Sequence, residues 1–149
     1  PAVERESKQQ GLDPYLVASL IRQESEFNPS VISYANAWGL MQLLPSVGSE
    51  MARKEHVRPF RTAYLLDPAV NLKLGTAYFR QLMDEFQGHP EYALAAYNAG
   101  DSRVKAWQAN GPYASLPEFV ESIPFTQTRE YVEAILRNRE IYRRLYGAK

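Results

Sequence analysis

Hydrophobic residues recur at intervals of three and four over most of this 149-residue chain, which is the spacing of amphipathic helices. No stretch of five or more residues alternates apolar and polar positions as a half-buried strand does. We therefore expect a nearly all-α protein, with seven or so helices in one compact lobe. Together with Pro, Gly and Asn breakers, the spacing predicts a short helix up to about residue 10 and further helices over about 14–26, 45–54, 68–87, 90–97, 101–107, 116–123 and 126–146.

One carboxylate interrupts an apolar helical stripe. Pro14 predicts the start of a helix, and the stripe of Val17, Leu20 and Ile21 that follows places Glu24 on the same inward face. Burial among apolar groups penalises the charged form of a carboxyl and raises its pKa. A carboxyl that keeps its proton near neutral pH can act as a general acid. Glu24 is therefore the first candidate for a catalytic residue.

Two segments place polar side chains beside apolar runs. Gln42 lies within a mostly apolar segment that precedes Pro45. This segment belongs to a loop over 30–44 that is long enough to be functional. Tyr97 and Asn98 stand at the end of a small apolar helix. Either pair of features could line a site, but a Gln before a helix can equally cap it, and an Asn before Ala-Gly can equally hold a turn. The residues alone leave these alternatives open.

Composition and charge narrow the function classes. Lys plus Arg and Asp plus Glu number 17 each, so the formal net charge is zero and the positive field expected of a nucleic-acid-binding protein is missing. The absence of Cys removes disulfides, thiolate nucleophiles and Cys-based zinc sites. No apolar run approaches the roughly 20 residues of a membrane span. The first residues resemble no signal peptide and include no initiating Met, so we expect a fragment or mature part of a longer protein.

Metal, triad and phosphate chemistry find no support in the motifs. His56 and His89 are the only histidines, and neither has the partner at i,i+4 that a helical metal site needs. There is no Gly-x-Ser-x-Gly nucleophile elbow and no Gly-rich phosphate loop. We expect neither a metal nor a cofactor. The ten tyrosines would suit sugar recognition, but most of them, like Tyr131 in the final helix, fall on inward stripes and are core by default.

Five segments, taken in order, resemble the motifs of one family. They are Gln-Glu-Ser-Glu-Phe-Asn-Pro at 23–29, Gly-Leu-Met-Gln-Leu-Leu-Pro at 39–45, Ala-Tyr-Asn-Ala-Gly at 96–100, Val-Glu-Ser-Ile-Pro-Phe at 120–125 and Thr-Arg-x-Tyr-Val at 128–132. The chain is similar, over about residues 11–146, to the catalytic domain of soluble lytic transglycosylases, which is related to goose-type lysozyme. The resemblance implies a lysozyme-like all-α fold with a substrate cleft, and one catalytic domain over residues 1–149.

The resemblance also implies a reaction. Members of this family cleave the β-1,4 bond between N-acetylmuramic acid and N-acetylglucosamine in peptidoglycan and leave a 1,6-anhydro ring, without water as the acceptor. Glu24 matches their single acid/base, which protonates the glycosidic oxygen and then takes a proton from the muramyl C6 hydroxyl. Ordinary glycosidases need a second carboxylate, whereas the resemblance implies that the substrate's 2-acetamido group replaces it.

The remaining site residues follow from the same resemblance. Positions expected to line the sugar cleft are Ser33, Gly39, Leu40, Met41, Gln42, Ala96, Tyr97, Asn98 and Glu121. Tyr97 is expected to hydrogen-bond the Glu24 carboxyl and Met41 to form an apolar wall, while Glu121 could equally be a solvated helix acid. Asn36 stands where the family usually has Gly, and because Asn tolerates a positive φ we expect the loop to keep its shape.

The expected partner is the peptidoglycan glycan strand, with no nucleic acid and no membrane span in this chain. We expect the domain to act as a monomer in the periplasm or outside the cell, because its implied substrate lies there. Two rival interpretations remain: hydrolysis of the goose-type lysozyme kind, in which water replaces the C6 hydroxyl, and a non-catalytic glycan-binding module.

Overall fold

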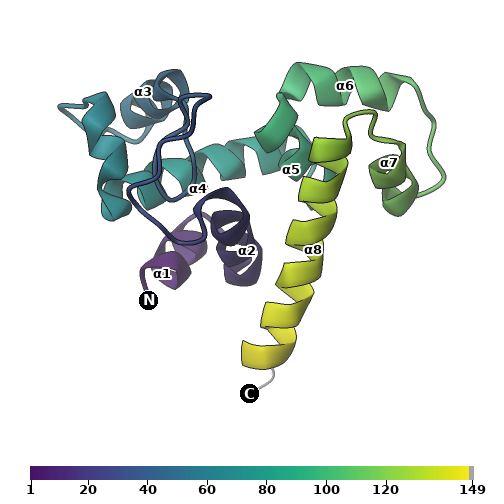
Figure 1. The fold of residues 1–149 in the computed structure, drawn as a ribbon, viewed down its shortest axis with the longest axis horizontal. Helices are drawn as coiled ribbons and strands as arrows, with labels where there is room; N and C mark the ends of the chain where they lie inside the picture. Colours follow the sequence, from purple (N-terminus) through teal and green to yellow (C-terminus); the bar gives the residue numbers. More distant parts are fainter. Residues whose placement is uncertain (148–149) are drawn as a thin grey trace.

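The computed structural model describes residues 1–147, which form eight α-helices and one 3₁₀-helix (Figure 1). The elements are α1 (Ala2–Gln9), α2 (Pro14–Ser25), α3 (Pro45–Lys54), η1 (Thr62–Leu66), α4 (Pro68–Glu85), α5 (Pro90–Ala99), α6 (Asp101–Ala109), α7 (Leu116–Ser122) and α8 (Thr126–Tyr146). Over these residues no strand forms, and the loop between α2 and α3 holds two isolated antiparallel bridges, Ile32 with Trp38 and Trp38 with Leu43. The all-α prediction is confirmed.

Proline and aspartate set where the helices begin. Pro is the first residue of α2, α3, α4 and α5, where its missing N–H costs no hydrogen bond. The Asp13 carboxylate accepts a hydrogen bond from Tyr15 N at 2.9 Å, and Asp67 accepts one from Ala69 N at 2.9 Å. Because the start of α2 is fixed in this way, the position of Glu24 in its last turn is fixed as well.

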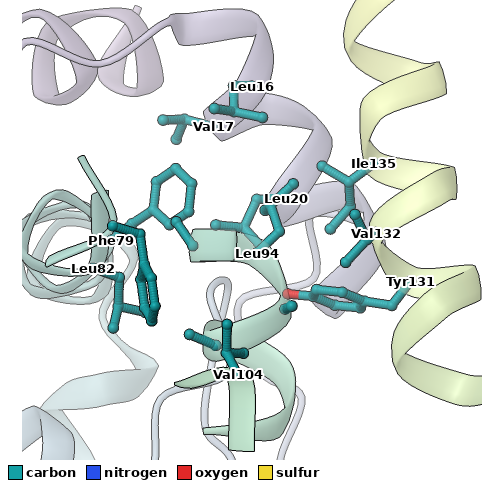
Figure 2. Packing of buried hydrophobic residues seen from close by; sticks show 14 of the residues in the cluster. Leu16, Val17, Leu20, Phe79, Leu82, Leu94, Val104, Tyr131, Val132 and Ile135 are labelled. Atoms are coloured by element: carbon teal, nitrogen blue, oxygen red, sulfur yellow. The ribbon is translucent and has the colours of Figure 1, made fainter. Parts of the chain in front are cut away.

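The larger hydrophobic cluster packs α2 against α5 and α8. Figure 2 shows Leu20 of α2, Leu94 of α5 and Val132 of α8 facing one another, and all three are fully buried. Phe79 and Leu82 extend the cluster along α4. Burying each such side chain stabilises the fold by about 1.5–3 kcal/mol. This packing brings the end of α2 beside the first half of α8.

A smaller cluster lies at the other end of α4. Leu43, Met51, Leu65 and Leu74 are its largest members, and they come from the loop, α3, η1 and α4. Figure 1 shows α3 and η1 at one end of the molecule and α6 and α7 at the other, with α4 running between them. Tyr78 and Tyr97 pack against both clusters, with ring centroids 5.4 Å apart. The two clusters therefore meet at these rings.

Two details of the fold bear on the site. The helix α5 continues through Asn98 to Ala99, so Asn98 lies in its last turn rather than in a closing turn, and Gly100 ends the helix at a φ of +96°. Among residues 1–147 no helix combines the length and the apolar character needed to cross a bilayer.

Candidate active site

Glu24 lies in the last turn of α2 with its carboxyl directed into the molecule. The side chain is partly buried, and its Oε2 accepts a hydrogen bond of 2.7 Å from the Tyr131 hydroxyl. Burial raises the pKa of Glu24 from its ordinary 4.5 to about 7, and the hydrogen bond from Tyr131 opposes this rise. Near neutral pH a large share of the molecules therefore carries the proton on Glu24.

The hydrogen-bond partner of Glu24 is Tyr131, and the prediction that Tyr97 fills this place is wrong. The hydroxyl of Tyr97 donates instead to the carbonyl oxygen of Met41, at 2.5 Å, and a phenol has only one hydrogen to donate. From the sequence, Tyr131 was expected in the core. A buried phenol needs a hydrogen-bond partner, so the position of Tyr131 on an inward stripe was the signal in the sequence that could have indicated its role.

The two phenols beside Glu24 stay neutral. Burial, and secondly the charge of Glu24, raise the pKa of both Tyr97 and Tyr131 well above the ordinary value of 10.0. Both rings are therefore permanent hydrogen-bond donors over the working pH range. Tyr78 continues this row of aromatics, and its pKa is raised by burial and by the carboxylates of Asp101, Glu50 and Glu85.

A buried amide fixes the loop that follows α2. Asn71 of α4 accepts a hydrogen bond from Met41 N at 2.8 Å and donates to the carbonyl oxygens of Trp38 and Leu65 at 2.9 Å each. Its side chain is fully buried. From the other side, the Ser25 hydroxyl donates to Leu40 O at 2.7 Å, which ties the loop to the residue next to Glu24. The sequence does not predict this role of Asn71, because its partners lie 6 to 33 positions away along the chain.

Two backbone positions in this loop require special residues. A Cβ added to Gly39, whose φ is +78°, would lie 2.3 Å from Leu65 O and 2.4 Å from Asn71 Nδ2. Asn36 has a φ of +65°, as expected of an Asn in place of Gly, and its Oδ1 accepts a hydrogen bond of 2.7 Å from the Trp38 indole.

Gln42 also holds the loop. Its amide nitrogen donates to Val31 O at 3.1 Å and to Gly39 O at 3.0 Å. Of the alternatives left open by the sequence, the amide therefore binds the backbone of its own loop and does not cap α3. Its role as a sugar contact stays a prediction.

Four other residues predicted to line the cleft are buried. Gly39, Leu40, Met41 and Ala96 are all buried, and Met41 packs against α4 at a position where only Gly75 leaves room: a Cβ there would lie 2.4 Å from Met41 Sδ. In this structure Leu40, Met41 and Ala96 belong to the larger hydrophobic cluster. Any contact they make with a sugar stays a prediction.

The three remaining predicted residues are Ser33, Asn98 and Glu121, and each has contacts of its own. The Ser33 hydroxyl accepts a hydrogen bond from Ala37 N at 3.0 Å inside the loop. Asn98, next to Tyr97, accepts one of 2.6 Å from the Thr128 hydroxyl, which links α5 to α8. Glu121 is exposed on α7 and lines a hollow with Pro117, not with Glu24 or Tyr97. Within residues 1–147 no three His, Asp or Glu side chains are grouped closely enough to hold a metal ion.

Comparison with known proteins places the chain in a family. Residues 1–115 match the family model described as Transglycosylase SLT domain. The chain belongs to this family. Residues 122–149 of the SLT domain chain also match a model described as Soluble lytic transglycosylase helical domain. The resemblance found in the five sequence motifs is thereby confirmed.

Relatives of this SLT domain are known from several bacteria. The chain is 38% identical over 133 residues to the soluble lytic murein transglycosylase of Salmonella typhimurium. The matched region covers 88% of this chain and 21% of the relative. The chain superposes with a TM-score of 0.92, at 37% identity, on a solved structure of lytic transglycosylase Slt from Pseudomonas aeruginosa. That structure is of an inactive mutant in which a glutamate is replaced by glutamine. The 70-kDa soluble lytic transglycosylase of Escherichia coli gives 0.90 at 35%.

Both superpositions cover 99% of this chain and 24% of the other. The SLT domain chain thus spans about a fifth to a quarter of the length of these relatives. The lysozyme-like all-α fold expected from the resemblance is confirmed.

Proposed function

We propose that this domain is a peptidoglycan lytic transglycosylase, which cleaves the β-1,4 bond between N-acetylmuramic acid and N-acetylglucosamine and leaves a 1,6-anhydromuramoyl end. The observation that carries the proposal is the inward-facing, partly buried Glu24, with a pKa of about 7. The causes of that pKa are burial and the hydrogen bond from Tyr131, with no carboxylate among them. A glycosidase with two catalytic carboxylates at about 5–9.5 Å would place a second acid beside the first.

The first step is proton donation. Tyr131 donates to Oε2 of Glu24, so the transferable proton is carried by Oε1. As the bond between the anomeric carbon and the glycosidic oxygen breaks, this proton passes to the oxygen of the departing N-acetylglucosamine. The hydrogen bond from Tyr131 then stabilises the carboxylate that remains, because it favours the charged form.

The second step returns the proton. The Glu24 carboxylate takes the proton of the muramyl C6 hydroxyl, whose oxygen forms a new bond to the anomeric carbon. One C–O bond breaks and one forms, no water is consumed, and Glu24 ends in its starting protonation state. In the family that the chain resembles, the 2-acetamido group of the substrate stabilises the anomeric carbon between the two steps, and we propose the same here.

We further propose that residues 1–149 form one catalytic domain. The helix α8 falls in the part that matches a helical-domain model. It nevertheless supplies Tyr131 to Glu24 and buries Val132 and Ile135 against α2 and α5. A unit that ended at residue 115 would lack the hydrogen-bond partner of its acid.

The proposed substrate sets the partner and the location. The glycan strand of peptidoglycan is the partner, the domain acts as a monomer, and the periplasm or cell exterior is the compartment where it meets that substrate. The relatives named soluble lytic murein transglycosylase support this proposal. A glutamate is also the residue replaced in the inactive Pseudomonas aeruginosa mutant, in keeping with a single essential acid.

Mass spectrometry of the muropeptides released from purified peptidoglycan tests the proposal. We expect ends lighter by one water, the anhydro form, from the unmodified domain and none from Glu24→Gln. Glu26→Gln, an exposed acid just beyond α2, is the matched control and should retain activity. Reducing muramic acid ends would favour a lysozyme-like hydrolase instead. If Glu24→Gln left the clearing of cell-wall suspensions unchanged, the assignment of Glu24 would be wrong.

A further inference from the structure

A donor-rich pocket lies where α5, α6 and α8 meet, next to the candidate active site. It has a volume of about 340 Å³. We call it the Arg103 pocket, and it is lined by Asn98, Arg103, Phe125, Thr126, Gln127 and Thr128. Neither the catalytic steps above nor the predicted set of sugar-lining residues uses it, apart from Asn98. No carboxylate lines it.

Arg103 is held over an exposed aromatic ring. Its guanidinium carbon lies 4.9 Å from the centroid of the Phe125 ring, and Phe125 is 42% exposed. Trp107 of α6 supports the same ring edge to face, with centroids 5.3 Å apart. Within residues 1–147 Arg103 makes no ion pair. A guanidinium stacked in this way keeps its N–H groups available for an anion.

Asn98 and Gln127 add neutral hydrogen-bonding groups to the pocket. The Thr128 hydroxyl donates to Asn98 Oδ1 at 2.6 Å, which sets the orientation of the amide and leaves its Nδ2 as the group that a ligand can meet. A cation beside amide donors, without a competing acid, is the arrangement that suits a carboxylate.

The pocket is close to Glu24 along two elements. Thr128 precedes Tyr131, the partner of Glu24, by three residues of α8, a rise of about 4.5 Å. Asn98 directly follows Tyr97 in α5. The bond from Thr128 to Asn98 at the pocket and the bond from Tyr131 to Glu24 are therefore made from neighbouring turns of α8.

The carboxylates on the other side of Tyr97 are mostly paired with lysines. Tyr78, whose ring lies 5.4 Å from that of Tyr97, has its pKa raised by burial and then by Asp101, Glu50 and Glu85. Glu50 pairs with Lys54 at 3.2 Å, and Glu85 pairs with Lys105 at 3.4 Å. Asp101 and Arg103 are two residues apart on α6, so they point to different faces of the helix.

We propose that the Arg103 pocket binds the carboxylate carried by the 3-O-lactyl substituent of a muramyl residue, either the free lactyl carboxylate or a carboxylate of the peptide attached to it. The inference rests on the proposed peptidoglycan substrate and deepens it. A polymer of N-acetylglucosamine has no such group, so Arg103 would favour peptidoglycan strands over chitin-type strands. Phe125 would pack against the apolar part of the substituent.

Calorimetric binding to the Glu24→Gln variant tests the pocket without turnover. The ligands are chitopentaose, peptidoglycan oligosaccharides stripped of peptide, the same oligosaccharides with intact peptides, and those with amidated peptide carboxylates. Adding Arg103→Gln should raise Kd about 5- to 20-fold for strands that carry the recognised carboxylate, and leave chitopentaose unchanged. Arg103→Lys should restore part of the loss, because Lys keeps the charge but not the fork. Raised salt should shrink the difference.

Arg144→Gln, an exposed Arg near the end of α8, is the matched control and should change no Kd. A loss with stripped strands identifies the lactyl carboxylate as the ligand. A loss with intact peptides that disappears on amidation identifies a peptide carboxylate. Equal Kd values with and without Arg103 for all four ligands, or an equal loss for chitopentaose, would overturn the inference.

The outcome is separable from that of the proposed function. Anhydro ends together with no effect of Arg103→Gln would leave the function standing and the pocket without its ligand. Reducing ends together with the carboxylate-dependent loss would do the reverse. Because Arg103 is exposed, the variant is expected to fold, and Phe125→Leu provides a second change, which should weaken the same ligands and spare chitopentaose.

Discussion

Burial and one phenol act on the Glu24 carboxyl in opposite directions. Burial alone would raise the pKa further and favour the protonated acid. The hydroxyl of Tyr131, at 2.7 Å, lowers the pKa again, and the result is about 7. A group that must first donate and then accept a proton works best when neither state is strongly preferred.

Tyr131→Phe should raise the pKa of Glu24, because it removes the donor that stabilises the carboxylate and keeps the ring in place. The protonated form is the active one. The kcat/KM of the unmodified domain should therefore be lost as pH rises through about 7, by about tenfold per pH unit above it, and the falling limb should move to higher pH in the variant.

The measurement is kcat/KM on a soluble glycan strand from pH 5 to 9, with Tyr142→Phe, a half-buried phenol further along α8, as the control. A limb that stays in place or moves to lower pH in Tyr131→Phe would show that the hydrogen bond does not set the titration.

The helices hold this chemistry through a few contacts between distant segments. The end of α2 is tied to the following loop by Ser25, the loop to α4 by Asn71, and α5 to α8 by the bond from Thr128 to Asn98. Glu24 and Tyr131 are 107 positions apart in the chain. The geometry of the acid therefore depends on how α2, α4, α5 and α8 pack, and not on any one of them.

Asn71→Leu keeps the size of the side chain but leaves Met41 N and Leu65 O without the Asn71 amide, while Trp38 O keeps its bond of 3.0 Å from Leu43 N. An unsatisfied buried polar group costs about 1–3 kcal/mol, so the variant should lose at least about 2 kcal/mol of unfolding free energy. Because Met41 also accepts from Tyr97, we expect kcat to fall more than KM rises.

Urea unfolding and steady-state kinetics at low temperature measure both effects, with Asn138→Leu in α8 as the control. A loss no larger than that of the control would mean that Asn71 does not organise the loop.

Local signals were enough to predict the helices. The Pro and Asp residues that start α2 and α4 carry their information within a few positions, and the apolar stripe that aims Glu24 inward lies within one helix. The partner of Glu24 could not be predicted in this way. Tyr97 and Tyr131 both bring a phenol to the site, and only the packing of α5 and α8 decides that Tyr97 meets the Met41 carbonyl while Tyr131 meets the carboxyl.

The loop after α2 shows the same limit. Its positive φ at Asn36 follows from a property of the residue itself. Its attachment to Asn71 does not, because an Asn on an otherwise apolar helix face gives no indication of which carbonyls it will meet. From the resemblance to a family, Gln42 was predicted to contact the sugar. The hydrogen bonds that its amide makes to its own loop were not predicted.

The folded domain as a whole is destabilised when the Glu24 carboxyl is charged. Two hydrophobic clusters meet at Tyr78 and Tyr97, and an ion pair of 2.9 Å between Arg143 and Asp13 joins the far part of α8 to the start of α2. Against this background, the folded domain keeps a carboxyl whose charged form it disfavours. Folding stability should therefore depend on pH through Glu24.

The sign of this dependence follows from the direction of the pKa shift. The folded pKa of about 7 exceeds the ordinary 4.5, so between these values the folded state binds more protons than the unfolded state and stability falls as pH rises. The penalty is complete above pH 7 and amounts to no more than about 3 kcal/mol.

Glu24→Gln should consequently raise Tm by several degrees at pH 8 and have little effect at pH 4, because Gln cannot ionise. Differential scanning calorimetry at the two pH values measures the difference, with Glu26→Gln as the control. An equal change in Tm at both pH values would contradict the account of how the fold raises the pKa of Glu24.

Digestion of peptidoglycan in water enriched in oxygen-18 tests most directly that one carboxyl carries the reaction without water as the acceptor. We predict that the released muramyl ends contain no oxygen-18 and are in the anhydro form, and that no product appears with Glu24→Gln. One oxygen-18 atom in each new muramyl end would contradict this and would show that water, not the C6 hydroxyl, attacks the anomeric carbon.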